Sequence, residues 1–235
     1  MTSREIRTLV IAVILFGLAA LLPFSGNGYF ISIGVTIAMY VVLSTSWALF
    51  SGPTHYISLA TAAFYGLGTM IVATGIETVP YVVLLLISAV AGALMAALVG
   101  LATLRLSGVY FVIFTLGLAE MIRQLVSWLQ NNLGGSRGLY VLTDLTEDHI
   151  YWELLALAAF VFLIGWWIGR SRLGFAMRII GNDETVAAHC GINTARSKIM
   201  LFMVSGMVAA LVGALLAPRW TYIEPNIAFS PLLSF

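Results

Sequence analysis

Long apolar runs separated by short polar turns fill almost the whole chain. A membrane-spanning helix needs roughly 20 mostly apolar residues, because each residue adds about 1.5 Å and the hydrocarbon core is about 30 Å thick. Seven runs approach or reach that length. The pattern therefore predicts seven transmembrane helices, at residues 9–24, 29–50, 57–74, 80–104, 109–130, 151–168 and 199–217.

The third run is short and rich in small residues. Ser51-Gly52-Pro53 is expected to break the helix before it, and residues 57–74 then carry Ser58, Gly66 and Gly68. Short segments interrupted by Gly and Pro form discontinuous helices where the surrounding protein, and not lipid, satisfies the broken backbone. The segment is thus either a pore-lining element or a plain helix whose small residues allow close packing.

The fifth run contains Glu120 and Arg123 near its middle. Ionisable side chains at that depth cost about 2.5 to 3.5 kcal/mol each on insertion scales. We therefore expect both to face the protein interior, and also each other, since residues at i and i+3 share a helix face. Two interpretations remain open: a buried ion pair that fixes helix register, or a pair on a transport pathway.

Small residues recur at helical spacing in two of the runs. Such stripes let helix backbones approach closely. One stripe lies in the fourth run, and two neighbouring rows lie in the last run, which predicts that the last helix contacts two neighbours. The stripes are Gly92, Ala96 and Gly100; Gly206, Ala210 and Ala214; and Ala209, Gly213 and Ala217.

Residues 170–198 form the longest basic loop. Five of the eleven Lys and Arg residues fall there, between two apolar runs, so the positive-inside rule places the loop in the cytoplasm. Over the whole chain, eight basic residues are assigned inside, two outside (Arg137 and Arg219) and one within the membrane (Arg123). The N-terminus is therefore expected to be cytoplasmic.

A short amphipathic helix is predicted at residues 182–191 of this loop. Asn182 is the expected N-cap, Asp183 and Glu184 suit the first turn, and Gly191 is a stop signal. A helix this short is not stable alone and needs a partner surface. We expect it to be presented to a soluble subunit.

Composition limits the function classes further. The chain has 235 residues, of which 61% are hydrophobic and 9% charged, with a mean hydropathy of +1.02, so it is a polytopic membrane protein and not a soluble globule. The single cysteine, Cys190, excludes an internal disulfide, and three scattered histidines give no metal-binding spacing. No cofactor is expected.

Four separated patterns carry a resemblance. They are Gly52-Pro53 followed by Ser58-Leu59-Ala60; Leu106-x-Gly108-Val109-Tyr110-Phe111 followed by Thr115-Leu116; Leu133-Gly134-Gly135 followed by Gly138-Leu139; and Glu184-x-x-Ala187-x-x-x-Gly191-Ile192 with Lys198. Together they resemble the LivM/LivH family of branched-chain amino-acid permeases of bacterial ABC importers. The chain departs from the family pattern at Ala60, Ser107, Leu133 and Gly181, where glycine, arginine, threonine and arginine are usual.

The resemblance implies an all-α permease domain over residues 1–235, without the further C-terminal spans of the family. It also makes 182–191 the coupling helix that docks into an ATPase, with Asp183, Glu184, Ala187, Ala188 and Gly191 as its matching residues. The implied partners are a second homologous permease subunit, two cytoplasmic ABC ATPase subunits and a periplasmic or extracellular substrate-binding protein. The implied location is the bacterial inner membrane, with no nucleic-acid partner.

The function implied is inward transport of branched-chain or other small apolar amino acids. Within the family, urea or short amides are the alternative substrates. Because no Walker motif occurs, ATP hydrolysis is expected in a partner and the chain is not expected to be an enzyme. An intramembrane enzyme using Glu120, His55 and Ser58 lacks any His-Glu-x-x-His or Gly-x-Ser-x-Gly motif, and a passive channel would leave the 182–191 helix unexplained.

Overall fold

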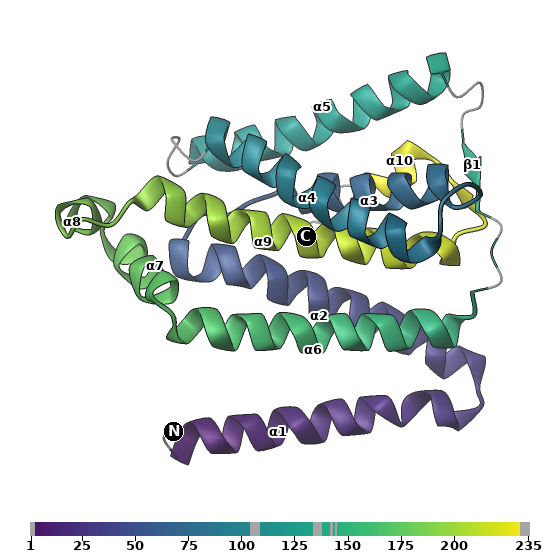
Figure 1. The fold of residues 1–235 in the computed structure, drawn as a ribbon, viewed down its shortest axis with the longest axis horizontal. Helices are drawn as coiled ribbons and strands as arrows, with labels where there is room; N and C mark the ends of the chain where they lie inside the picture. The colour runs from purple at the N-terminus through teal and green to yellow at the C-terminus, as the bar shows by residue number, and fades with distance from the viewer. Residues whose placement is uncertain (1–2, 104–108, 134–137, 142, 144, 231–235) are drawn as a thin grey trace.

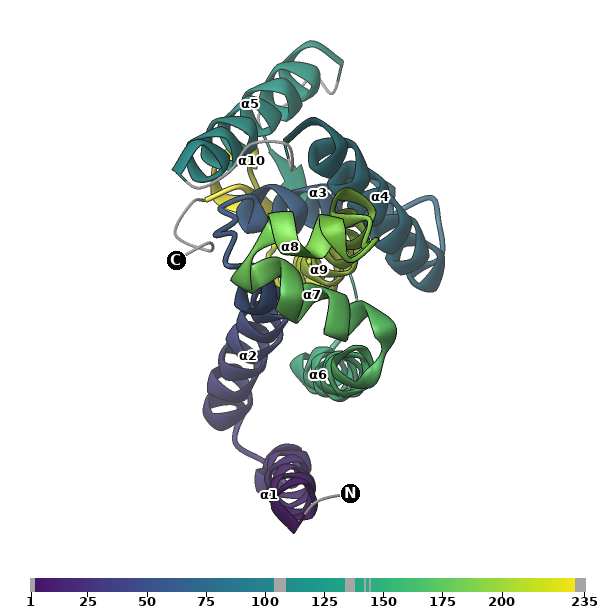
Figure 2. The ribbon, with the colours of Figure 1, turned by 90° about the vertical axis from the view of Figure 1, so that its left-hand side faces the viewer.

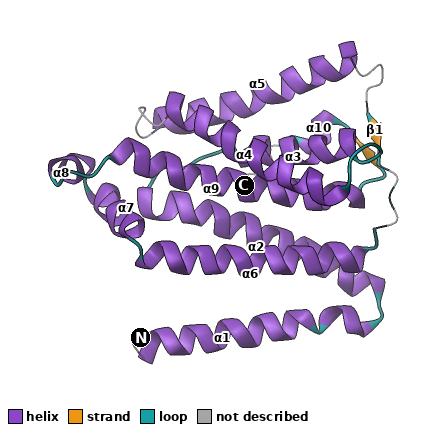
Figure 3. Cartoon of the chain, viewed as in Figure 1, coloured by secondary structure: helices purple, strands orange, loops and turns teal. Residues whose placement is uncertain are grey.

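The computed structural model describes residues 3–103, 109–133, 138–141, 143 and 145–230. The described chain is almost entirely helical (Figure 3). The main helices are α1 (Ser3–Ala20), α2 (Gly28–Thr54), α3 (Thr61–Gly75), α4 (Tyr81–Thr103), α5 (Val109–Leu133), α6 (Glu147–Arg170) and α9 (Thr194–Leu216). Shorter elements are η1 (Leu22–Ser25), α7 (Arg172–Asn182), α8 (Glu184–His189), η2 (Ala217–Arg219) and α10 (Pro225–Ala228), with strands β1 (Leu139–Tyr140) and β2 (Tyr222–Ile223).

The long helices run side by side, with α9 at the centre of the bundle (Figures 1 and 2). Helix α9 packs against α2, α3 and α4, while α1 and α5 lie at opposite edges. Helices α7 and α8 cover one end of the bundle, and the antiparallel β1–β2 pair and α10 lie at the other. The first residues of α1 lie at the same end as α8. This arrangement agrees with the expectation that both lie on the cytoplasmic side.

The small-residue rows explain why α9 is central. A β-carbon added at Gly92 of α4 would meet the backbone of Gly206 in α9, and one added at Gly213 would collide with the backbone carbonyl of Tyr65 in α3. A β-carbon at Gly68 of α3 would likewise collide with the carbonyl of Ala210. The prediction that the last helix contacts two neighbours through small residues is confirmed.

The number of membrane-length helices is smaller than predicted. Within the described residues, five helices are long and apolar enough to cross a membrane: α2, α4, α5, α6 and α9. The predicted first and third spans form shorter apolar helices, Val10–Phe24 and Thr61–Gly75. A largely helical chain with several membrane-length helices is therefore confirmed, but a count of seven spans is not.

The break expected at Ser51-Gly52-Pro53 lies later than predicted. Helix α2 continues through Pro53 to Thr54, and His55 then ends the helix in the left-handed region at φ 58°. Its N–H still donates to the Ser51 carbonyl at 3.0 Å. Residues 55–60 are non-helical, and α3 begins only at Thr61.

Protein groups satisfy the backbone of this non-helical 55–60 segment. The Trp47 indole donates to the Ser58 carbonyl at 2.9 Å, the Leu59 N–H donates to the Thr115 hydroxyl at 3.2 Å, and the Ser58 hydroxyl accepts from the Ala60 N–H at 3.3 Å. Ser58 and Ala60 are both buried. A broken helix at membrane depth requires such internal partners.

Some expected features lie outside the described residues. These are the turn at Ser107-Gly108, the inner cation Arg105, and residues 134–137 of the glycine-rich stretch, which include Arg137. Helix α6 begins at Glu147, four residues before the predicted start, because Glu147 and Asp148 are favourable in a first helical turn.

Candidate functional site

Asp183 starts helix α8 and also ends α7. Its carboxylate accepts from the backbone N–H groups of Val186 and Thr185, at 3.2 and 2.7 Å. These two bonds hold the pKa of Asp183 below its ordinary value. The prediction of Asn182 as N-cap was wrong by one residue: Asn182 is the last residue of α7, and only the Asp183 side chain reaches the free donors of α8.

Gly191 stops α8, as predicted. It adopts a left-handed φ of 77°, its N–H donates to the Ala188 carbonyl at 3.0 Å, and the next N–H, from Ile192, donates to the Ala187 carbonyl at 3.1 Å. This pair of bonds is the Schellman motif, in which a positive φ favours glycine. Helix α8 is thus a single six-residue element with a defined start and end.

Helix α7 was not predicted. Ser171 caps it by accepting from the Gly174 N–H at 3.3 Å, and its buried face packs on α2, α6 and α9. The signal was present in the sequence: Leu173, Ala176, Met177 and Ile180 recur at helical spacing directly after a serine. It was overlooked because the surrounding arginines made the segment resemble a basic loop.

The structure separates the two alanines of the predicted coupling helix. Ala187 is fully buried within this chain, in its main hydrophobic core. Ala188 is exposed, as are Val186 and His189. The outward side of α8, defined here as Val186, Ala188 and His189, is the part that another protein can contact.

Glu184 fastens α8 to two other parts of the chain. One carboxylate oxygen lies 2.8 Å from Lys198 Nζ of α9, and the other accepts from the Tyr56 hydroxyl at 3.1 Å. Lys198 is only 1% exposed and lies 4.6 Å from the centre of the Tyr56 ring. Burial raises the pKa of Glu184, but the hydrogen bond and charge of Lys198 outweigh it and hold the pKa below its ordinary value. Tyr56, Glu184 and Lys198 are called the Glu184 cluster.

Ser58, Gly66 and Gly68 lie inside the chain. Ser58 is 3% exposed within the 55–60 segment, Gly66 lies against the ring of Phe229, and Gly68 lies against Ala210 of α9. Their positions show close internal packing. A role in lining a pathway stays a prediction.

Glu120 and Arg123 form the expected i, i+3 pair on α5. The Arg123 Nε donates to Glu120 Oε2 at 2.9 Å, and Arg123 also donates to the side chain of Asn226 in α10. Gln124 donates to Glu120 at 3.2 Å. The Glu120 side chain is 47% exposed, so this chain alone does not bury the pair.

Further polar residues continue this side of α5. Glu120, Gln124, Ser127 and Asn131 recur at i, i+4, i+7 and i+11, which places them on one helix face. With Arg123 they make up the polar face of α5. Near its outer end a cavity of about 310 Å³ is lined by Ser127, Gln130, Asn131, Glu224, Pro225 and Asn226.

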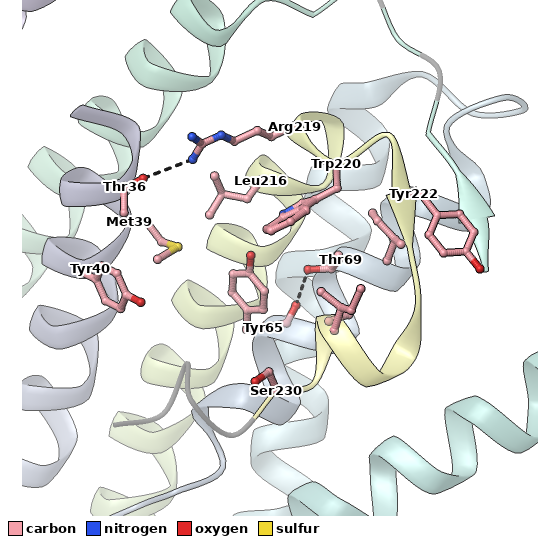
Figure 4. A pocket seen from close by; sticks show the side chains of 13 residues that line it. Thr36, Met39, Tyr40, Tyr65, Thr69, Leu216, Arg219, Trp220, Tyr222 and Ser230 are labelled. Atoms are coloured by element: carbon pink, nitrogen blue, oxygen red, sulfur yellow. Dashed lines mark hydrogen bonds between the residues drawn. The ribbon is translucent and has the colours of Figure 1, made fainter. Parts of the chain in front are cut away.

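A second cavity, of about 500 Å³, lies between α2, α3 and the chain that follows α9 (Figure 4). Aromatic side chains from these elements, Tyr40, Tyr65 and Trp220, point into it. Arg219 at its rim is held by Glu147 of α6 at 3.3 Å and by Thr36 of α2 at 3.3 Å. Arg219, which belongs to η2, therefore links η2 to α2 and α6.

Comparisons with known proteins agree with this architecture. Residues 29–235 match the family described as "Branched-chain amino acid transport system / permease component". The chain is 24% identical to the high-affinity branched-chain amino acid transport system permease protein LivM of Escherichia coli K12, over 91% of this chain and 58% of LivM. It is 32% identical to LivH of Salmonella typhimurium, over 40% of this chain and 30% of LivH.

A relative with a different named substrate matches as broadly. The autoinducer 2 import system permease protein LsrC of Photorhabdus laumondii is 25% identical over 95% of this chain and 68% of LsrC. No solved structure matches the chain. The chain spans less than two thirds of the length of LivM and of LivH. Since the family match covers most of the sequence, the resemblance is confirmed, and this chain belongs to the permease component family of branched-chain amino acid transport systems.

Proposed function

We propose that this chain is the permease subunit of an ABC importer that moves branched-chain or other small apolar amino acids into the cytoplasm. The observation that carries the proposal is the polar face of α5. A membrane-length helix exposes Glu120, Gln124 and Asn131 on one side, and such groups are costly in lipid. This side is therefore expected to face a water-filled route or a second permease subunit.

Helix α8 is the proposed contact with an ATPase. Helix α8 lies at one end of the bundle (Figure 1). Its outward side, Val186, Ala188 and His189, is exposed. Asp183 and Gly191 define its ends, while Glu184 and Ala187 hold it on the chain. All five residues suggested by the sequence thus contribute to coupling, but Ala188 alone among them offers a side chain on the outward side.

The Glu184 cluster connects α8 to two helices of the bundle. Through Lys198 it is joined to the start of α9, the central helix. Through Tyr56 it is joined to the 55–60 segment, which leads directly into α3. A displacement of α8 by ATP binding in a partner is therefore expected to reach both α3 and α9.

The partners follow from the same proposal. They are a second related permease that closes the route along the polar face of α5, two cytoplasmic ATPases, and an external substrate-binding protein at the end that carries α10. In this orientation the start of α1 and helix α8 lie in the cytoplasm of a bacterium, beneath its inner membrane. Cys190, which is exposed, should react with an impermeant thiol reagent only from the cytoplasmic side, whereas a cysteine replacing exposed Thr78 should react only from outside.

Uptake by the reconstituted importer tests the function. Proteoliposomes containing this chain, its second permease, the ATPases and the binding protein would be offered leucine, urea, arabinose and autoinducer 2 in turn. ATP-dependent accumulation of leucine above the other three is expected. Accumulation of urea or a sugar with none of leucine would overturn the substrate assignment, and accumulation without ATP would indicate a passive channel.

A further inference from the structure

Gln130, in the last turns of α5, is a buried amide without a partner. It is 8% exposed, and neither its Oε1 nor its Nε2 has a hydrogen-bond partner within the part of the chain that the structure describes. Buried polar groups in native proteins nearly always have a hydrogen-bond partner, because an unpaired group loses its hydrogen bonds to water and gains none in exchange. The amide is therefore available to a molecule from outside the chain.

The cavity that Gln130 lines has the size of a small-ligand site. Its volume of about 310 Å³ lies at the lower end of the range typical of such sites, roughly 300 to 1,000 Å³. Ser127 and Asn131 come from α5, and Glu224 and Asn226 come from the segment at the start of α10. Hydroxyl, amide and carboxylate groups thus surround one small space.

A carboxylate lies in the wall of this cavity, and a guanidinium lies behind the wall, bonded to one of its residues. The Glu224 carboxylate is in its wall, where it accepts from the Tyr222 hydroxyl at 2.8 Å. Asn226 shares the wall and accepts from Arg123, whose guanidinium also pairs with Glu120. A site with a carboxylate, an unpaired amide and a neighbouring guanidinium is complementary to a small molecule that carries both an ammonium and a carboxylate group.

We propose that this cavity binds the head group of an α-amino acid at the outer end of the transport route. The ammonium group lies toward Glu224 and the Gln130 carbonyl oxygen, and the carboxylate lies toward the donors of Gln130, Ser127 and Asn226. This inference rests on the proposed import of an amino acid and assigns that solute a site. Leucine should therefore compete for the site, whereas isoamylamine and 4-methylpentanoate, which each lack one of the two charged groups, should compete poorly.

The test is the Gln130→Leu variant in the complete reconstituted importer. The apolar side chain keeps the approximate size and removes both hydrogen-bonding atoms. The KM for leucine should rise about tenfold, the effect of losing a hydrogen bond of ordinary strength, while kcat stays unchanged. Asn132→Leu is the matched control, because Asn132 is exposed outside the cavity and donates to the Trp128 carbonyl. Its KM should equal that of the original protein.

A second measurement keeps the proposal testable if Gln130→Leu folds poorly. In Ser127→Cys, leucine should slow alkylation at position 127, read by peptide mass spectrometry separately from Cys190, and isoamylamine should not. An unchanged KM in folded Gln130→Leu, or equal alkylation with and without leucine, would overturn the site while leaving leucine transport intact. Weakened association of the two permease subunits at an unchanged KM would show that Gln130 pairs with the second subunit instead. Failure of the original protein to transport leucine would instead count against the proposed function.

Discussion

Helices α9 and α5 have similar lengths and both are apolar enough to cross a membrane, yet their surroundings differ. In the most apolar stretch of α9, 61% of the residues are buried within the chain, against 17% in α5. Helix α9 touches its neighbours through glycine and alanine, whereas α5 leaves Glu120 and Gln124 exposed. Contacts within this chain fix the position of α9, whereas the proposed function assigns the exposed side of α5 to a transport route or a second subunit.

The largest effect is expected where a glycine of α3 meets α9. Gly68→Ala places a methyl group against the carbonyl of Ala210, so the two backbones must separate, at an expected cost on the order of 3 kcal/mol. Gly117→Ala on α5 is the matched control: no atom lies within 4 Å of its added carbon, and the change should stabilise the helix by about 0.5 to 1 kcal/mol. The melting temperature in detergent should therefore fall for Gly68→Ala and rise for Gly117→Ala. Similar shifts for both would show that α9 is no more tightly packed than α5.

The two alanines of α8 also differ in their surroundings, since Ala187 is buried within the chain and Ala188 is exposed. Ala188→Trp adds bulk to the outward side, so the chain should fold normally but neither copurify with its ATPases nor transport. Ala187→Trp overfills a fully buried position and should cost about 1 to 3 kcal/mol or more, visible as reduced folded protein. Normal ATPase binding by Ala188→Trp would mean that the outward side of α8 does not contact the ATPase.

The ion pair on α5 should matter for transport more than for folding. In Glu120→Gln the melting temperature should stay close to that of the original protein, because exposed pairs contribute little to stability. If the carboxylate faces the route, as the proposed function requires, leucine uptake should fall several-fold and substrate preference should change. Glu77→Gln, in an exposed turn elsewhere, is the control. A lower melting temperature with an unchanged preference would make the pair structural.

The smallest effect concerns the cap of α8. The pKa of Asp183 is lowered in the folded chain, so the stability it contributes is present above the ordinary aspartate pKa of about 4 and is lost as the pH falls through the folded value. Hydrogen-exchange protection of the Thr185 and Val186 amides should therefore fall in acid. Asp183→Asn keeps an acceptor without titrating, and its protection should depend less on pH. Equal acid sensitivity in both proteins would exclude Asp183 as the cause.

Sequence reasoning succeeded where the signal is local. The rows around Gly206 and Gly213 and the stop at Gly191 follow from residue spacing and backbone preference, and the structure confirms them. The N-cap was placed one residue early because Asn182 and Asp183 are both good caps, and the choice depends on where α7 ends.

Contacts between distant residues could not be predicted. The Tyr56 hydroxyl donates to Glu184, which lies 128 positions later in the sequence, and no sequence pattern around either residue predicts this hydrogen bond. The prediction that Glu120 faces the interior was also wrong for this chain, where its side chain is 47% exposed. A carboxylate at membrane depth must avoid lipid, but the sequence does not show whether this chain or a partner covers it. Gln130 was missed because its unpaired amide is visible only once its neighbours are placed.

Two adjacent residues of α5 show whether its polar face lines a water-filled route, as the proposed function requires. Gln124 lies on that face and Leu125 does not, although both are exposed in this chain. In the assembled importer, Gln124→Cys should react with an impermeant methanethiosulfonate reagent, and leucine should slow the reaction, whereas Leu125→Cys should stay unmodified against lipid. Modification of both at equal rates, or of neither, would show that the polar face of α5 does not line a water-filled route.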